Sequence, residues 1–299
     1  MNSNEVKEHY SSELVQSEIT RYAKGRWVGI YCLRGLDGIP TLFRYSKGKR
    51  PLKIECREDM LKIFEDYATF LPRTIYATAN IYKHLTDYDD LRDLSNIISC
   101  TATWDIDNTL DKWEATIEVV KSILSFLRDE GIEDSIIVKW SGEGCHVHLH
   151  QNAISLNSSP ETHPLDLAYS IVEYVRMKLQ GSIMNIALKY NAINLKVENN
   201  IDPQRLFTCP LSLHRALDVV CICIPPDSLS DFTPEWIRLR TFKHYRGWDR
   251  FKLGEANRLA EKAYKLIGPR STYRRSIRRK HMPLDKQIMK WLEKGQDHR

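Results

Sequence analysis

The spacing of apolar residues predicts an α/β lobe in the first third of the chain. Residues 4–24 and 58–71 carry apolar positions three and four apart, the pattern of a helix packed by one face. Short β-prone runs lie at 26–33, 40–45 and 73–77. The turn Gly35-Leu36-Asp37-Gly38 separates the first two runs, so we expect them to form a hairpin.

The run from Ile97 to Asp107 is β-prone and turns acidic only at its end, which predicts one strand that ends in two carboxylates. Side chains two apart on a strand point the same way, so Asp105 and Asp107 share a face. Neighbouring carboxylates repel unless a positive charge, commonly a divalent cation, lies between them. Two acids two apart are also common on exposed strands, but here Trp104 and Ile106 alternate with them, which favours one buried and one functional face.

Helices and strands alternate in the middle of the chain. The predicted elements are a helix capped at Asn108 or Thr109 and ended by Gly131, strands at 136–140 and 145–150, and a helix at about 165–179. This order predicts an α/β sandwich with helices on one face of a sheet.

A glycine-bearing turn joins the two middle strands. Gly142 and Gly144 let the backbone turn tightly and approach a ligand, which leaves Ser141 and His146 close together to bind phosphate oxygens. Alternation places His146, His148 and His150 on one face of the second strand. The plainer interpretation is a hairpin with a surface histidine.

Polar groups gather between residues 194 and 224, beside a predicted strand at 219–224. They are Glu198, Asp202, Arg205 and the segment from Cys209 to Arg215. Taken singly, these side chains have a plain interpretation as surface groups flanking a strand. Farther along, Thr233-Pro234-Glu235 predicts a helix start and residues 255–267 predict an amphipathic helix that ends at Gly268.

The composition is that of an ordinary globular protein. Of 299 residues, 42% are hydrophobic and 28% are charged. There is no apolar run of about 18 residues and no signal segment, so we expect no membrane span, no export and a cytoplasmic location. The seven cysteines include no C-x-x-C pair, which favours buried free thiols.

The basic excess is confined to the end of the chain. The net charge is +5, yet residues 1–269 hold 34 basic and 36 acidic groups, whereas residues 270–299 hold 10 basic and three acidic ones. Within this tail the basic cluster comprises Arg274, Arg275, Arg278, Arg279 and Lys280. Such a cluster can neutralise nucleic-acid phosphates, although a solvated terminal helix or a linker fits the same pattern.

Three separate segments together resemble the archaeo-eukaryotic primase and primase-polymerase superfamily. The family's first motif, an apolar strand ending in D-x-D or D-x-E, is similar to Thr103-Trp104-Asp105-Ile106-Asp107. Its second, a serine followed by glycines and a histidine, is similar to Ser141-Gly142-Glu143-Gly144-Cys145-His146. Its third region is similar to Arg205-Leu206 and Pro210-Leu211-Ser212-Leu213-His214. The order agrees, and the resemblance spans residues 73–224.

The resemblance implies a DNA primase or primase-polymerase that uses two metal ions. By this resemblance, the ligands of two Mg²⁺ or Mn²⁺ ions would be Asp105, Asp107 and Glu198. The side chains that bind the incoming NTP or dNTP would be Ser141, His146, Arg205, Ser212 and His214. The reaction would be attack of a 3′-hydroxyl on the α-phosphate, directed by a single-stranded DNA template. A large primase subunit or a replicative helicase is the implied protein partner.

The chain departs from the family pattern in three places. Counting back from Pro210 places Lys196 where an acid is expected, so Glu198 is the nearest candidate for the third ligand and Asp202 matches a more peripheral acid. Thr208 stands where many relatives carry a second basic residue. The zinc ligands that many relatives carry between the motifs are not evident.

The implied fold is α/β (α+β), a two-lobed primase-polymerase core with an RRM-like sheet covered by helices and a C-terminal helical segment. The predicted domains are an N-terminal α/β lobe at 1–96, an RRM-like catalytic lobe at 97–230, a helical segment at 231–268 and a basic tail at 269–299.

Two other functions remain open from the sequence. His146-Val147-His148 is a His-hydrophobe-His pair, which in rolling-circle replication nucleases binds one metal beside a nucleophilic tyrosine, here Tyr169 or Tyr174. That hypothesis leaves the two acids of the first motif without a role. The other alternative is a non-catalytic nucleic-acid-binding module that relies on the basic tail.

Overall fold

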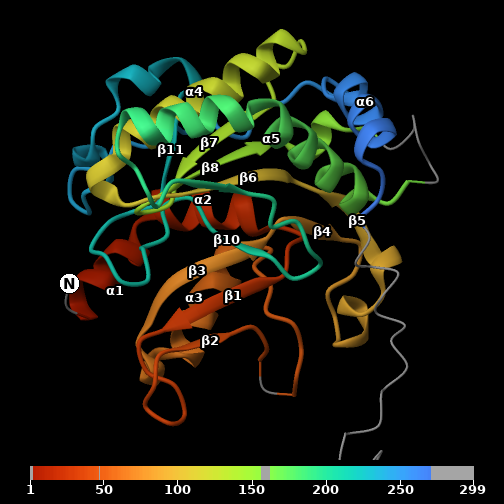
Figure 1. Cartoon of the computed structure of the whole chain (residues 1–299). Coiled ribbons are helices and arrows are strands. Elements are labelled where there is room, and N and C mark those ends of the chain that lie inside the picture. The colour runs from red at the N-terminus through yellow and green to blue at the C-terminus, as the bar shows by residue number, and fades with distance from the viewer. Residues whose placement is uncertain (1–2, 47, 156–161, 271–299) are drawn as a thin grey trace, which may run out of the picture. The chain divides into compact units, whose positions relative to one another are not determined.

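Two antiparallel sheets, each covered by helices, make up most of the molecule (Figure 1). The computed structural model describes residues 3–46, 48–155 and 162–270. The chain forms two units, Met1–Gly268 and Pro269–Arg299, and every element named below belongs to the first.

The first sheet has four strands in the order β10-β3-β1-β2. Their bounds are β1 Val28–Cys32, β2 Thr41–Phe43, β3 Pro72–Thr78 and β10 Leu206–Thr208. Three helices accompany it: α1 Ser3–Ser11, α2 Glu13–Ala23 and α3 Arg57–Asp66. Ile30 and Ile75 are fully buried on the face against which α2 packs, because alternate strand residues there are apolar. Tyr31 and Tyr76 lie on the other face.

The second sheet has five strands in the order β11-β7-β8-β6-β9. Their bounds are β6 Ala102–Asp107, β7 Ile136–Trp140, β8 Cys145–Leu149, β9 Lys196–Glu198 and β11 Ile222–Ile224. The helices α4 Trp113–Asp129 and α5 Pro164–Lys189 lie side by side over one face (Figure 1). Trp104 is buried on that face and its indole N–H donates to the Val172 carbonyl at 3.1 Å. Polar side chains occupy the opposite face, which carries the site described below.

Smaller elements complete the unit. The strands β4 Asn80–Tyr82 and β5 Ile97–Cys100 form a two-stranded sheet, and α6 Asn257–Ile267 packs against α5. None of the helices in the described ranges is long and apolar enough to cross a bilayer.

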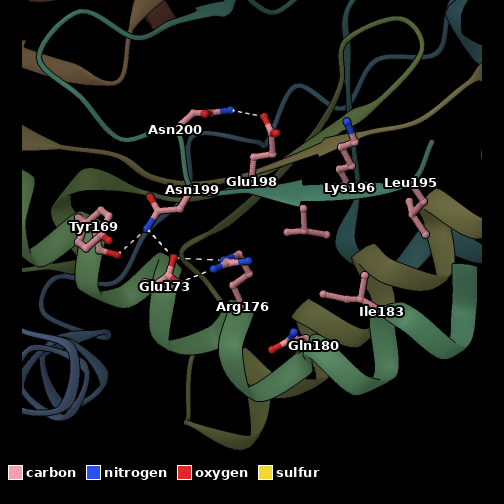
Figure 2. Close-up of a pocket in the computed structure, with 11 residues that line it drawn as sticks. Tyr169, Glu173, Arg176, Gln180, Ile183, Leu195, Lys196, Glu198, Asn199 and Asn200 are labelled. Carbon is pink, nitrogen blue, oxygen red and sulfur yellow. Dashed lines mark hydrogen bonds and ion pairs between the residues drawn. The ribbon is translucent and has the colours of Figure 1, made fainter. Parts of the chain in front are cut away.

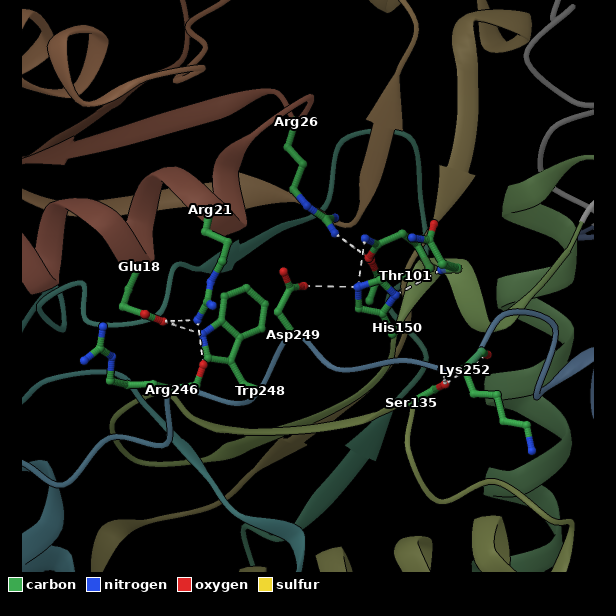
Figure 3. A network of polar contacts seen from close by, with 12 residues as sticks. Glu18, Arg21, Arg26, Thr101, Ser135, His150, Arg246, Trp248, Asp249 and Lys252 are labelled. Atoms are coloured by element: carbon green, nitrogen blue, oxygen red, sulfur yellow. Dashed lines mark hydrogen bonds and ion pairs between the residues drawn. The ribbon is translucent and has the colours of Figure 1, made fainter.

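Buried Glu18 on α2 ties the segment that precedes α6 to the rest of the unit (Figure 3). Its carboxylate accepts hydrogen bonds from His244 Nε2 at 3.0 Å, Trp248 Nε1 at 2.5 Å and Arg21 Nη2 at 2.7 Å. Burial alone would raise the pKa of Glu18, but the hydrogen bonds from His244 and Trp248 lower it overall. The donors of His244 and Trp248 therefore fix the 244–248 segment against α2.

All seven cysteines lie in the described part of the chain, and each has a free thiol. Six of them are buried, as the sequence predicts, and only Cys56 is exposed. Cys56 stands just before α3, where its backbone N–H donates to the Asp59 carboxylate.

The predicted α/β class is confirmed, and so are most predicted elements. The hairpin of β1 and β2 pairs Ile30 with Phe43, and the glycine turn joins β7 to β8. The predicted helix at 255–267 is observed as α6, and its end at Gly268 has a φ of 75°.

Two predicted elements are each divided in the structure. The single strand predicted for 97–107 is wrong, because β5 pairs with β4 whereas β6 pairs with β8 and β9. Thr101 lies at the break, where its N–H donates to the Ala79 carbonyl and its hydroxyl accepts from Arg26. The helix predicted for 4–24 is likewise two helices, interrupted at Ser12, which has an extended backbone with ψ of 128°.

The short strands β9 and β10 were not predicted, and β10 returns the chain to the first sheet by pairing with β3. One strand of the predicted catalytic lobe therefore joins the sheet of the N-terminal lobe, and the predicted boundaries at 96 and 230 stay a prediction.

Candidate active site

A row of polar side chains crosses the face of the second sheet that α4 and α5 leave uncovered. Strand register places Asp105 opposite both His146 on β8 and Glu198 on β9. The next strand continues the row, since Lys139 on β7 lies opposite His146. Side chains opposite each other on neighbouring antiparallel strands share a face. Three segments that are far apart in sequence thus meet at Asp105.

Asp105 is almost fully buried and has three donors. His146 Nε2 lies 3.2 Å from Oδ1, while Asn200 Nδ2 lies 3.0 Å from Oδ2 and Arg205 forms an ion pair with Oδ2. Burial alone would raise the pKa of Asp105, but the hydrogen bond and charge of His146, with Arg205 and Asn200, lower it below its usual value. Asp105 is therefore ionised across the neutral range.

Asp107 is exposed and lies one alternation further along β6, on the same face. Its pKa is raised by desolvation and by the negative charges of Asp105 and Glu198. Carboxylate oxygens are the donors that Mg²⁺ and Mn²⁺ prefer, and a divalent cation would relieve this repulsion, so the chemistry of the three carboxylates fits such an ion. In the described ranges, however, no three His, Cys, Asp or Glu side chains already stand together as a metal-binding group.

Glu198 belongs to the row by register but lines a groove beside β9 (Figure 2). This groove holds about 570 Å³ and lies between β9 and the face of α5 that carries Tyr169 and Glu173. Asn200 links Glu198 back to the row, because its Nδ2 lies 3.0 Å from both Glu198 Oε2 and Asp105 Oδ2. Its neighbour Asn199 instead donates to the Tyr169 carbonyl on α5.

Both glycines of the turn between β7 and β8 are needed for close contacts. A Cβ at Gly142 would lie 2.5 Å from Cδ2 of His214, and a Cβ at Gly144 would lie 2.2 Å from the carbonyl oxygen of Ile106. Gly142 also has a φ of 143°, which L side chains rarely adopt. The first glycine thus admits the His214 ring, and the second allows the turn to approach β6.

The orientation of the His214 ring is set by its own loop. Its Nδ1 accepts the backbone N–H of Leu217 at 2.9 Å and that of Ala216 at 3.3 Å. Burial lowers the pKa of His214, so the neutral ring carries its proton on Nε2. This nitrogen is then a hydrogen-bond donor beside the glycine turn.

Seven of the predicted site residues line one cavity of about 610 Å³, and Glu198 is not among them. The predicted site residues that line it are Asp105, Asp107, Ser141, His146, Asp202, Arg205 and His214. Its walls also include residues that were not predicted to belong to the site: Tyr31, Leu42, Arg44, Tyr76, Leu206 and Arg215. Four of these come from β1, β2, β3 and β10, so both sheets contribute to the cavity.

Ser212 does not line the cavity. It is fully buried, and its hydroxyl accepts the Ile75 N–H at 2.7 Å and contacts the Tyr10 hydroxyl at 3.1 Å. The observed contacts of Ser212 therefore join α1, β3 and the segment before β11.

The histidine pair does not lie beside Tyr169 or Tyr174, the two predicted nucleophiles, both of which are on α5. His148 is fully buried, with its Nδ1 at 2.7 Å from the Thr103 hydroxyl, whereas His146 binds Asp105. Tyr174 is buried on α5, which covers the opposite face of the sheet, and packs against Phe126. The prediction that all three histidines share a face holds for the first two, because His150 lies beyond β8 and contacts Asp249.

The basic cluster from Arg274 to Lys280 lies outside the described residues. Its predicted contact with nucleic acid stays a prediction.

Comparison with known proteins finds similarity among solved structures and none among family models or curated proteins. No protein-family model matches the sequence. No curated protein matches it either. Among solved structures, the polymerase domain of Mycobacterium tuberculosis ligase D, in complex with DNA, is similar with a TM-score of 0.53 over 90% of each chain. The fold of this chain is similar to that of the ligase D polymerase domain. At 11% sequence identity the likeness to the ligase D polymerase domain is one of fold alone.

Proposed function

We propose that this protein is a primase-polymerase, a metal-dependent nucleotidyltransferase that extends a strand on a single-stranded DNA template. The observation that carries the proposal is the shared cavity, because residues of all three sequence motifs reach it from β6, from the β7–β8 turn and from the segment around β10. The fold likeness to a polymerase domain that was solved with DNA supports the same class of reaction.

The carboxylates of the row would hold two Mg²⁺ or Mn²⁺ ions. Asp105, Asp107 and Glu198 are the proposed ligands, with Asp202 as the alternative third acid; the register that places Glu198 opposite Asp105 favours Glu198. When bound, such ions activate the attacking 3′-hydroxyl and stabilise charge on the leaving oxygen.

The basic and polar groups of the cavity would bind the triphosphate of an incoming NTP or dNTP. Arg205 and the His214 Nε2–H are donors that suit phosphate oxygens, and Ser141 adds a hydroxyl at the turn. His146 holds Asp105 at Oδ1, so it orients a metal ligand as well as lining the cavity. Asp105 would then exchange its contact with Arg205 for a metal ion, which leaves that guanidinium for phosphate.

Nucleotide incorporation on a primed template tests the proposal directly. We expect the wild type to extend a primer with labelled NTPs or dNTPs when Mg²⁺ or Mn²⁺ is present, and Asp107→Asn to lose at least about 100-fold of that activity, as expected when a metal ligand is removed. Asp111→Asn is the control, because Asp111 is an exposed acid four residues away that does not line the cavity.

Two outcomes would contradict the proposal. One is extension by Asp107→Asn at the wild-type rate. The other is a covalent tyrosine-DNA adduct, which would favour the rolling-circle nuclease. An unprimed template and added helicase or large primase subunit would show whether synthesis starts de novo and with which partner.

A further inference from the structure

The wall of the cavity that comes from the first sheet is aromatic and apolar. Tyr31 on β1 lies opposite Thr74, and Tyr76 on β3 lies opposite Gly29, so the two tyrosines are diagonal neighbours on one face. Diagonal neighbours on adjacent antiparallel strands lie about 7–8 Å apart, which suits two rings that flank a common space. Both rings are partly exposed, and both line the cavity.

The floor between these rings is apolar. Gly29 has no side chain, and two leucine side chains fill the space above it. Leu206 from β10 and Leu42 from β2 close over this glycine: a Cβ there would lie 2.9 Å from Leu206 Cδ1 and 3.2 Å from Leu42 Cδ1. We call Tyr31, Leu42, Tyr76 and Leu206 the tyrosine face. Its chemistry suits a flat, weakly polar group such as a nucleobase, which stacks on aromatic rings.

The residues around the tyrosine face suit the phosphate groups of a nucleotide. A tyrosine is uncharged at neutral pH, and burial raises the pKa of Tyr76 further, to about 12, so its ring does not repel phosphate. Arg44 lines the same cavity, and its buried Nε has no hydrogen-bond partner among the residues that the structure describes. Arg205, His214 and Arg215 line the cavity as well, so one cavity offers an aromatic wall and a wall of hydrogen-bond donors, two of which are cationic.

We propose that the tyrosine face binds the base of the incoming nucleoside triphosphate, whose phosphates point toward Arg205 and His214. This inference rests on the proposed function and names the subsite for the base. A volume of about 610 Å³ lies within the range of roughly 300–1,000 Å³ typical of small-ligand sites, so one cavity can hold both halves of the ligand. Stacking accepts every base, as an enzyme that copies a template requires.

Binding of two ligands to the full chain in the presence of Mn²⁺ tests the subsite. The ligands are a nucleoside triphosphate and inorganic triphosphate, which lacks the base. We expect Tyr31→Leu and Tyr76→Leu each to weaken the nucleoside triphosphate by about 5- to 100-fold, because base stacking contributes at that level, and to leave inorganic triphosphate unchanged. Tyr31→Phe and Tyr76→Phe keep the ring and should bind as the wild type does.

Tyr88→Leu is the matched control, since Tyr88 is an exposed tyrosine that precedes the second sheet and does not line the cavity. Retained binding of inorganic triphosphate shows at the same time that a variant is folded.

Three results would overturn the inference. The first is wild-type affinity for the nucleoside triphosphate in both leucine variants, and the second is an equal loss for the two ligands. The third is a loss confined to a single-stranded oligonucleotide, which would assign the tyrosine face to the template strand. If the wild type binds the nucleoside triphosphate through these tyrosines but incorporates nothing, the subsite stands and the proposed function fails.

Discussion

Asp105 and Asp107 are two residues apart in sequence and have opposite electrostatic surroundings. Asp105 is buried with three donors, and its pKa is lowered, whereas Asp107 is exposed and its pKa is raised. Because Arg205 already balances Asp105, the site does not require a metal ion to tolerate a buried carboxylate. The negative charge that attracts a cation is concentrated around Asp107 and Glu198.

Asn200 is the residue that holds the two strands' carboxylates at a fixed separation. Its Nδ2 bridges Asp105 Oδ2 and Glu198 Oε2, so we expect Asn200→Leu to lower the affinity for Mn²⁺ by about 10- to 100-fold, the usual effect of losing a partner that orients a metal ligand. Titration of Mn²⁺ by electron paramagnetic resonance, without nucleotide, measures this directly.

Asn199→Leu is the control for that experiment. Asn199 is the adjacent residue of the same type, but its amide donates to the Tyr169 carbonyl and Glu173 on α5. Equal losses in both variants would mean that Asn200 acts only through folding.

At the scale of single residues, the order of the three motifs predicted which side chains come together. Asp105, Asp107, the turn and Arg205 with His214 meet in one cavity, as their order in three motifs implied, whereas the predicted ligand Glu198 lines the groove beside β9. Asn200 was missed because a single asparagine after a short strand has no spacing signal. Tyr31 and Tyr76 were missed because alternation shows which residues of one strand share a face, but not which face lines a cavity.

The turn between β7 and β8 packs directly against the loop that carries His214. We expect Gly142→Ala to weaken nucleoside triphosphate binding and to lower the free energy of unfolding by about 1–3 kcal/mol, because its Cβ would lie 2.5 Å from Cδ2 of His214 and displace the ring. Calorimetric binding and urea unfolding measure the two effects.

Gly131→Ala separates backbone strain from displacement of the histidine. Gly131 has a φ of 86° and no atom within 4 Å of an added Cβ, so this variant should lose about 1 kcal/mol of stability and no nucleotide affinity. Unchanged binding in Gly142→Ala would refute the role of the turn in positioning His214.

Helices and strands were predicted well where the apolar pattern extends over many residues. They were predicted poorly where pairing with a distant segment sets the ends of a strand. The helix α4 and the β7–β8 hairpin carry local signals in Gly131 and in the glycine turn. The division of 97–107 depends on Thr101 pairing with Ala79, a contact that no pattern within the run encodes. β9 and β10 are three residues each, too short for alternation to be read.

The buried carboxylate of Glu18 joins the N-terminal helix α2 to the 244–248 segment and stabilises the unit. We expect Glu18→Gln to lower the free energy of unfolding by about 1.5–3 kcal/mol at neutral pH, the usual value of hydrogen bonds to a charged group. The folded-state pKa is lowered from 4.5, so this stabilisation is complete above that pH and is lost as the pH falls below it. Urea unfolding at pH 7 and pH 4 should therefore show a smaller difference at pH 4.

Glu13→Gln on the same helix provides the comparison. The Glu13 side chain is 85% exposed and lies 3.5 Å from Arg57, so its replacement should change stability by less than about 0.5 kcal/mol. A difference between Glu18→Gln and wild type that is as large at pH 4 as at pH 7 would rule out the charge of Glu18 as the cause.

Removal of the basic tail tests its contribution to stability and to DNA binding. Met1–Gly268 is a compact unit, so we expect a protein that ends at Gly268 to unfold at the wild-type temperature. We also expect it to bind single-stranded DNA more weakly and with a shallower dependence of log K on log salt, by about 0.7 for each phosphate that the tail neutralises. An unchanged slope would identify the tail as a spacer.

The distribution of thiols makes the protein suitable for site-specific fluorophore attachment without any engineered residue. Cys56 is exposed before α3, whereas the other six cysteines, all within the described ranges, are buried. Burial raises the pKa of all six, to about 12 for Cys32 and Cys100, which keeps those thiols unreactive while the molecule is folded. A maleimide dye should therefore label native molecules once, and the appearance of further labels would count the molecules that have opened.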